Sequence, residues 1–221
     1  ILHFASTEEY RKRIIQLGEE PERVFNVGAL GIDNICKMRL LSRTELEKDL
    51  SFKFGKRNIL VTYHPVTLEE NTAEYQFRQL LSALDEFPEL RIIFTKPNAD
   101  MNGRVIAELI DQYVMANPDK SVSFTSLGQL RYLSVIQYTD AVVGNSSSGI
   151  IEVPSLGKPS VNIGDRQKGR IRAESVIDSD PEKNSIIRAL QMAFDPEFSD
   201  GCKKAVNPYG DGRSAEKIIL I

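Results

Sequence analysis

The sequence predicts an α/β protein in which helices cover both faces of a parallel sheet. From residue 58 onward, short apolar runs typical of buried strands alternate with longer segments that read as helices. The chain has 221 residues, of which 41% are hydrophobic, so it can bury one substantial core. We therefore expect a single domain over residues 1–221.

The residues before this alternation are predicted to form two helices and one strand. A Ser/Thr cap before Glu8 and Glu9 begins a helix over residues 6–18, and Gly18 ends it. A short strand follows over residues 24–28. The mixed, charged stretch 36–50 is predicted to be helical.

In the alternating region, each predicted strand except the one over residues 159–163 is followed by a predicted helix. The strands span residues 58–63, 91–95, 121–125, 140–143, 159–163 and 175–177. The helices span residues 71–87, 102–116, 128–138, 148–156 and 181–194, and a terminal helix follows Gly212. Residues 195–212 are rich in turn-forming residues and are predicted to be a loop that wraps back to a neighbouring domain.

Charge and cysteine content exclude several classes of function. The 28 basic and 31 acidic residues give a net charge of −3, which argues against broad attraction to nucleic acid or anionic membranes. Cys36 and Cys202 have no C-x-x-C spacing, and two histidines do not support a structural zinc site or a disulfide framework. These features favour a reducing cytoplasm. No apolar run approaches the roughly 18 residues of a membrane span, and the start lacks the features of a signal peptide.

The most informative segment begins at Asp140 and ends at Pro159. A short apolar strand leads into the small-residue turn Gly144-Asn-Ser-Ser-Ser-Gly149 and then into a helix start. Such a turn exposes backbone N–H groups at the positive end of a helix, and no bulky side chain blocks the approach. We expect an anion there. The alternative is a turn whose serines merely cap the helix.

Glu152 lies about one turn into that helix. Its carboxylate would repel a phosphate, but it can accept hydrogen bonds from a sugar diol. An anion site next to a diol site indicates a sugar nucleotide. A solvated helix carboxylate is the alternative interpretation.

Polar side chains follow four of the predicted strands: His64, Ser126, Asn145 and Arg166. In open parallel sheets, ligands bind outside the carboxyl ends of the strands. We therefore expect these four residues at one edge, where they would form a site. Asn98 and Asp100 are also expected near a strand end, where a cleft role and helix capping stay equally open.

Five segments together resemble the UDP-N-acetylglucosamine 2-epimerases, and they cover the chain in order. They are His3-Phe-Ala-Ser-Thr-Glu-Glu-Tyr10, Phe25-Asn-Val-Gly-Ala-Leu-Gly-Ile-Asp33, Thr62-Tyr-His-Pro-Val-Thr67, residues 144–170, and Asn207-Pro-Tyr-Gly-Asp-Gly212. The run Asp165-Arg-Gln-Lys-Gly-Arg170 is similar to the hydrolysing branch, which makes N-acetylmannosamine for sialic-acid-type sugars.

The resemblance implies a Rossmann-like domain that is the C-terminal half of a two-domain, GT-B-like enzyme. A start at Ile1 rather than at methionine is consistent with a chain cut from a longer protein. Residues 1–20 and the tail 195–221 are then expected to pack toward the absent N-terminal domain. The implied partners are a UDP-sugar, UDP, that absent domain and further copies of the protein, with no nucleic acid, membrane, metal or cofactor.

The resemblance also implies roles for individual residues. His64 and Arg166 are expected to stabilise the departing pyrophosphate, His64 as an imidazolium and Arg166 as a planar fork. Glu152 is expected to hold the ribose. The remaining predicted UDP ligands are Phe124, Thr125, Ser126 and Leu127 at the uracil, and Asn145, Ser146, Ser147, Ser148, Gly149 and Arg170 near the phosphates.

The basic residues near Arg166 are not all assigned to the site. Lys168, Arg170 and Arg172 belong to the same loop, and Arg172 is interpreted as solvated. His3 is interpreted as structural. No general base is assigned, because the family's acid and base carboxylates belong to the absent domain.

Three other functions stay open. A closely related one is a hydrolysing 2-epimerase that acts on UDP-N,N'-diacetylbacillosamine. More distant alternatives are a GT-B glycosyltransferase and a nucleotide-sensing module without catalysis.

Overall fold

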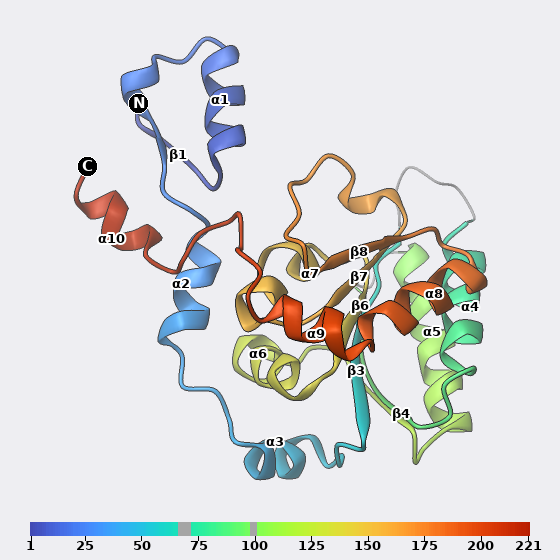
Figure 1. Ribbon diagram of the computed structural model, residues 1–221. Helices are drawn as coiled ribbons and strands as arrows, with labels where there is room; N and C mark the ends of the chain where they lie inside the picture. Colours follow the sequence, from blue (N-terminus) through green and yellow to red (C-terminus); the bar gives the residue numbers. More distant parts are fainter. Residues whose placement is uncertain (66–71, 98–100) are drawn as a thin grey trace.

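A parallel sheet forms the centre of the computed structural model, which describes residues 1–65, 72–97 and 101–221 (Figure 1). Within these ranges, six parallel strands are hydrogen-bonded in the order β5-β4-β3-β6-β7-β8. Their bounds are β3 (Arg57–Thr62), β4 (Leu90–Thr95), β5 (Ser121–Phe124), β6 (Ala141–Gly144), β7 (Ser160–Ile163) and β8 (Val176–Ser179). In the central register, Ile59 of β3 pairs with Ile92 of β4 and with Ala141 of β6.

Helices cover both faces of this sheet, so the predicted fold class is confirmed. One face packs against α4 (Ala73–Leu84), α5 (Met101–Ala116) and α8 (Lys183–Ala193). The opposite face packs against α3 (Arg43–Leu50) and α6 (Gly128–Tyr138). Successive residues of a strand point to opposite faces, and helices cover both faces of this sheet. β3 is therefore buried almost throughout and reads as a continuous apolar run.

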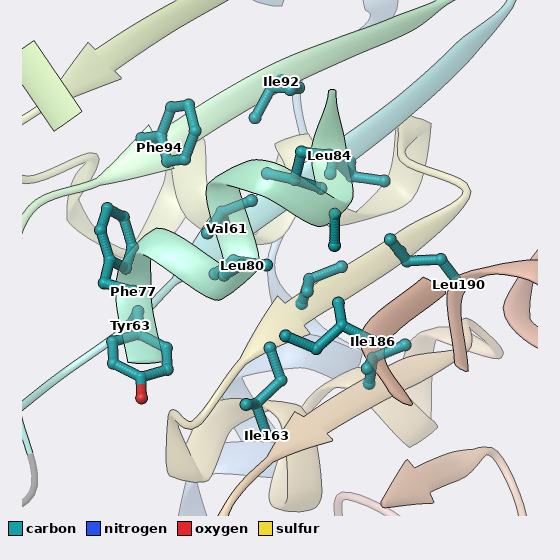
Figure 2. Packing of buried hydrophobic residues seen from close by; sticks show 14 of the residues in the cluster. Val61, Tyr63, Phe77, Leu80, Leu84, Ile92, Phe94, Ile163, Ile186 and Leu190 are labelled. Carbon is teal, nitrogen blue, oxygen red and sulfur yellow. The ribbon is translucent and has the colours of Figure 1, made fainter. Parts of the chain in front are cut away.

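The larger of the two cores is shown in Figure 2. Val61 of β3 lies among Leu80 and Leu84 of α4, with Ile186 and Leu190 of α8 nearby. All five side chains are fully buried or nearly so. This core fixes the strands whose carboxyl ends carry the polar residues predicted from the sequence.

The predicted helix over residues 36–50 is wrong in its extent. The structure has two helices here, α2 (Leu30–Lys37) and α3, separated by an extended segment. Ser42 begins α3 with a capping box: its hydroxyl accepts a hydrogen bond from the Glu45 N–H, and the Glu45 carboxylate accepts one from the Ser42 N–H. The Ser-x-x-Glu spacing is a sequence signal for that helix start.

Two further predictions differ from the structure between residues 148 and 212. The helix predicted over residues 148–156 is α7 (Ser147–Ile151) followed by a 3-10 helix (Val153–Leu156), because Pro154 has no N–H for a helical bond. The predicted loop 195–212 contains α9 (Pro196–Cys202). Asp195 caps it by accepting from the Phe198 N–H.

Most of the remaining bounds agree with the predictions. The terminal helix is α10 (Ser214–Ile219), and β8 runs two residues past the predicted strand end at residue 177. The helix predicted over residues 71–87 is α4, which begins at Ala73; residue 71 itself lies outside the described residues. Asn98 and Asp100 lie outside the described residues. No helix in the described ranges is long and apolar enough to cross a bilayer.

The N-terminal residues form a separate unit that the sequence did not fully predict. β1 (His3–Ala5) pairs in parallel with β2 (Val24–Asn26), and α1 (Glu8–Gln16) connects them. The strand β1 was not predicted, because three residues carry little periodicity. Figure 1 shows this two-stranded unit apart from the main sheet; α2 follows the unit along the chain and contacts α10.

The C-terminal tail returns to the start of α2. The Asp33 carboxylate of α2 accepts hydrogen bonds from the Ser214 N–H (2.9 Å) and the Ala215 N–H (2.8 Å) of α10. Asp33 is only 5% exposed. It therefore caps a helix 181 residues away in the sequence, whose own N-cap residue, Arg213, makes no side-chain cap.

Candidate functional site

The candidate site lies where the order of the strands reverses. From β3 the sheet extends through β4 and β5 to one side, and β6, β7 and β8 lie on the other side of β3. A crevice at the carboxyl ends of parallel strands is expected at such a point. The loops after β3 and β6, which carry His64 and Asn145, flank it.

His64 and Asn145 are tied together across this point. The Asn145 side-chain oxygen accepts from the His64 N–H at 2.7 Å, and the Asn145 side-chain nitrogen donates to the His64 carbonyl at 2.8 Å. Asn145 is fully buried. Gly144 makes this approach possible, because it has a φ of +139° and a Cβ there would lie 2.0 Å from the Thr62 carbonyl oxygen.

The small-residue turn after β6 has both capping and exposed groups. The Ser146 hydroxyl accepts from the Ser148 N–H at 3.3 Å, so Ser146 does cap α7. Ser146 and Ser147 are both partly exposed. Gly149 is buried, donates its N–H to the Ser146 carbonyl, and leaves room for Ser160 of β7, so its contribution is to packing. The Ser146 O–H and the partly exposed Ser147 are the groups of this turn that can reach a ligand.

The loop after β7, residues 164–172, contains four basic side chains that differ in their partners; we call it the basic loop. Lys168 pairs with Asp165 at 3.0 Å, and Arg172 pairs with Asp178 at 3.0 Å. Neither Arg166 nor Arg170 has a carboxylate partner among the residues that the structure describes. Arg172, which was interpreted as solvated, is thus held by an ion pair.

The basic loop is anchored to the turn after β6. Arg166 Nη1 donates to the Asn145 carbonyl at 3.0 Å, and Gln167 Nε2 donates to the same oxygen at 2.8 Å. Partial burial lowers the pKa of Arg166, and the neighbouring Arg170 guanidinium lowers it further. Two nearby positive charges without a carboxylate partner form a site that an anion would stabilise.

A cavity of about 450 Å³ opens at the carboxyl ends of β3, β4 and β5. This volume is within the usual range for small-molecule sites. Among the described residues, Glu152 is the carboxylate in its lining, and His64 lies in the same lining. The other lining residues are Thr62, Thr95, Lys96, Thr125, Ser126, Leu127, Gly128, Gln129, Tyr132 and Leu133.

The predicted uracil segment lies partly in this cavity. Thr125, Ser126 and Leu127 line it, whereas Phe124 does not. The Phe124 carbonyl accepts from the Lys96 N–H at 2.9 Å, and the Leu127 carbonyl accepts from Arg131 at 2.8 Å. Thr125 and Ser126, which lie between these two carbonyl groups in the sequence, line the cavity.

Two residues at the site were missed from the sequence. Gln167 holds the basic loop, but nothing in its local pattern distinguishes it from a solvated amide. Tyr132 lines the cavity near Glu152, and burial raises its pKa while the hydroxyls of Ser148 and Thr62 oppose this shift. The sequence did offer one signal for Tyr132: it lies in the first half of a helix that begins just after the end of a strand, where ligands bind.

A second cavity of similar size does not suit a diphosphate. It lies near the ends of β7 and β8, and its lining includes three acidic residues, Asp165, Asp178 and Asp180, and one basic residue, Arg172, which is paired with Asp178. The net negative charge of this lining would repel an anion. In the described part of the chain, no group of three His, Cys, Asp or Glu side chains is placed to hold a metal ion, and Cys36 and Cys202 are free.

Comparison with known proteins adds direct evidence about the family. The model of the family described as "UDP-N-acetylglucosamine 2-epimerase" matches residues 1–221. The chain belongs to the UDP-N-acetylglucosamine 2-epimerase family. The resemblance inferred from the sequence motifs is thereby confirmed.

Among relatives of this epimerase-family chain, the GDP/UDP-N,N'-diacetylbacillosamine 2-epimerase (hydrolyzing) of Campylobacter jejuni is 44% identical over 99% of the chain and 56% of its own length. The polysialic acid biosynthesis protein P7 of Escherichia coli is 42% identical over 94% of the chain and 53% of its own length. The chain spans about half the length of these relatives.

A solved structure shares the fold of this epimerase-family chain. The S. aureus MnaA–UDP co-structure matches with a TM-score of 0.77 and 22% identity, over 99% of this chain and 57% of that one. At this level of identity the match concerns the fold.

Proposed function

We propose that this chain is the UDP-binding half of a hydrolysing UDP-N-acetylglucosamine 2-epimerase, which converts UDP-N-acetylglucosamine and water into N-acetylmannosamine and UDP. The observation that carries the proposal is the pair Arg166 and Arg170, basic side chains without carboxylate partners, anchored beside the turn after β6. Membership of the epimerase family supports the reaction class.

UDP fits the arrangement with its pyrophosphate between the two arginines and the Ser146–Ser147 turn. The ribose diol then reaches Glu152, and the uracil reaches the wall formed by residues 125–127. His64 belongs to both regions, because Asn145 binds its backbone and the residue lines the cavity. Each part of UDP thus meets a group of suitable chemistry: cations for phosphate, a carboxylate for the diol, and backbone for the base edge.

The proposed reaction begins with elimination across C1 and C2 of the sugar. A base removes the C2 proton, the C1–oxygen bond breaks, and its electron pair leaves with UDP. Negative charge develops on the departing pyrophosphate, where Arg166, Arg170 and protonated His64 stabilise it. Water then adds to the resulting glycal to give N-acetylmannosamine. The base comes from the part of the protein that precedes this chain.

The two-stranded unit supports the proposal of a second domain. Ile1, Leu2 and Phe4 around β1 are exposed, as are Ile219 at the end of α10 and Leu220, which follows it. Parallel sheets are stable when both faces are covered and are rarely two-stranded. We propose that residues 1–20 and α10 pack on the preceding domain, whereas the tail segment 207–212 packs within this chain. We also propose a homo-oligomer in the cytoplasm.

A second candidate substrate is favoured by a specific observation. The relative that is 44% identical is named for GDP/UDP-N,N'-diacetylbacillosamine. Both substrates present a nucleoside diphosphate to this half of the cleft, and the sugar is read largely by the other half. The groups described above therefore serve either reaction.

Product analysis of the full-length protein tests the proposal. It is incubated separately with UDP-N-acetylglucosamine and with UDP-N,N'-diacetylbacillosamine, and the products are identified by NMR. Free UDP with N-acetylmannosamine is expected. Preferential turnover of the diacetamido sugar would establish the second candidate instead. Transfer of the sugar to an acceptor would identify a glycosyltransferase, and binding of UDP without turnover would identify a sensing module.

A further inference from the structure

Ile171, at the end of the basic loop, has both of its backbone groups bonded by tyrosine side chains. Its N–H donates to the Tyr10 hydroxyl at 3.4 Å, and its carbonyl accepts from the Tyr209 hydroxyl at 3.0 Å. The two hydroxyl oxygens lie 3.2 Å apart, and the ring centroids are 6.3 Å apart. Tyr209 is 1% exposed. We call this arrangement the tyrosine clamp.

The positions of the protons in the clamp follow from the number of donors. A tyrosine hydroxyl has one proton. Tyr209 uses it toward the Ile171 carbonyl, so the proton between the two tyrosines comes from Tyr10. Tyr10 thus donates to Tyr209 while it accepts from Ile171. Burial raises the pKa of Tyr209 and the Tyr10 hydroxyl raises it further, against the nearby charges of Arg170 and Arg172, so Tyr209 stays a neutral donor.

Tyr209 is itself anchored to the helix that follows the small-residue turn. Its N–H donates to Asn207, whose side-chain nitrogen donates to the Ile151 carbonyl at 2.8 Å and to Ser155 at 2.7 Å. The Tyr209 carbonyl accepts a hydrogen bond from the Ala29 N–H at 2.7 Å. The clamp is therefore anchored at the C-terminal end of α7, the helix that the small-residue turn begins, and in the 3-10 helix that follows it.

The basic loop is held at both ends. Gln167 and Arg166 bind the Asn145 carbonyl at its start, and the clamp binds Ile171 at its end. Arg170 is adjacent to Ile171 and has no carboxylate partner in the described residues. Two positive charges so close together repel each other, and a loop held at one end would let them move apart.

We propose that Tyr10 and Tyr209 are positioning residues, which hold Arg166 and Arg170 together for the pyrophosphate of the nucleotide. This inference rests on the proposed function. It adds that Tyr10 belongs to the two-stranded unit, so the affinity of the site for an anion depends on the position of that unit relative to the basic loop. The nucleotide site and the proposed contact with the preceding domain are then coupled through one hydroxyl group.

Removing single hydroxyl groups tests the clamp. Tyr209→Phe and Tyr10→Phe are compared with Tyr138→Phe, a matched control whose hydroxyl donates to the Leu41 carbonyl at 3.3 Å away from the basic loop. Binding of UDP, pyrophosphate and uridine to each variant is measured by calorimetry. The clamp variants should bind UDP and pyrophosphate about three- to tenfold more weakly, the effect of one lost hydrogen bond to the basic loop, and uridine as wild type does.

Two results would overturn the proposal: unchanged pyrophosphate affinity in both clamp variants, or an equal loss for uridine. Hydrogen exchange of residues 165–172 provides a test without any ligand. Exchange should be faster than wild type in both clamp variants and unchanged in Tyr138→Phe, and equal rates in all of them would contradict the clamp. If wild type binds no UDP while this exchange pattern holds, the proposed function has failed and the clamp has not.

Discussion

Arg166 and Asn145 belong to loops after neighbouring strands, and the Arg166 guanidinium donates to the Asn145 main-chain carbonyl at 3.0 Å. One nitrogen of the guanidinium is thereby used to fix its position, and the others remain for a ligand. Asn145 in turn holds His64 by two hydrogen bonds. The loops after β3, β6 and β7 consequently form one connected site.

This geometry predicts the effect of Arg166→Lys in the full-length enzyme. A lysine has a single ammonium group, which cannot bind the Asn145 carbonyl and also present a fork to the pyrophosphate. In the proposed reaction, charge develops on the pyrophosphate as UDP leaves, so kcat should fall about 100-fold with a smaller change in KM. Steady-state kinetics can separate the two effects when substrate release is fast.

Lys168→Met serves as the control for Arg166→Lys, since Lys168 is exposed in the same loop and pairs with Asp165. It should leave kcat nearly unchanged. A raised KM with unchanged kcat in Arg166→Lys would instead assign this residue to uniform binding of substrate. No change in either parameter would remove it from the site.

Glu152→Gln should separate recognition of ribose from recognition of phosphate. The substitution removes the charge and replaces one acceptor oxygen with a donor, so UDP affinity should fall by about 1.5 to 3 kcal/mol, or roughly 10- to 150-fold. Pyrophosphate has no ribose and should bind as before. Calorimetry with both ligands measures the difference, and equal losses would show that the carboxylate acts elsewhere.

The chain by itself should bind UDP weakly and catalyse no turnover. The strand-end groups are present in it, but half a cleft neither excludes water nor supplies the base. Calorimetry with UDP and a product assay with UDP-N-acetylglucosamine are run on the same preparation. Detectable turnover by this chain would contradict the proposed division of the site.

Asp33 should make stability depend on pH at the acidic end. Burial raises the pKa of Asp33, but hydrogen bonds from Ala215 and Ser214 outweigh that effect, and the net pKa is lowered. Because the pKa of Asp33 is lower in the folded state, its ionised carboxylate stabilises the fold fully at pH values above the unfolded-state pKa near 3.8. This stabilisation is lost as the pH falls through the folded-state pKa.

Asp33→Asn should therefore lower the free energy of unfolding by about 2 kcal/mol at pH 7, since one acceptor oxygen of a charged hydrogen-bonded group is lost. Urea unfolding at pH 7 and at pH 3 measures the change, and the difference from wild type should shrink at pH 3. Asp49→Asn is the matched control, because the exposed Asp49 lies 3.7 Å from Arg131 in a surface ion pair. A pH-independent difference would show that the charge of Asp33 is not involved.

Much of the fold was predictable because its signals are local. The strands β3 and β6 are buried on both faces, so each reads as an apolar run within a few residues. A residue that follows a strand in the sequence must also lie at its end in space. His64 and Asn145 could therefore be assigned to one edge of the sheet before the strand order was known.

The partners of the polar side chains were not predictable in this way. Lys168, Arg170 and Arg172 look alike in the sequence, and the positions of Asp165 and Asp178 decide which of the basic side chains is left without a carboxylate partner. The weak strand β1 likewise depends on its pairing with β2, because three residues carry little pattern of their own.

The sequence by itself determined the fold class, the family and the edge of the sheet that carries the candidate site, because these depend on periodicity and on residues adjacent in the chain. Only the tertiary structure decided that Tyr10 and Tyr209, 199 residues apart, meet at Ile171. The physical reason is that a hydrogen bond requires atoms within about 3 Å, and such a distance between remote segments is set by the packing of the whole chain.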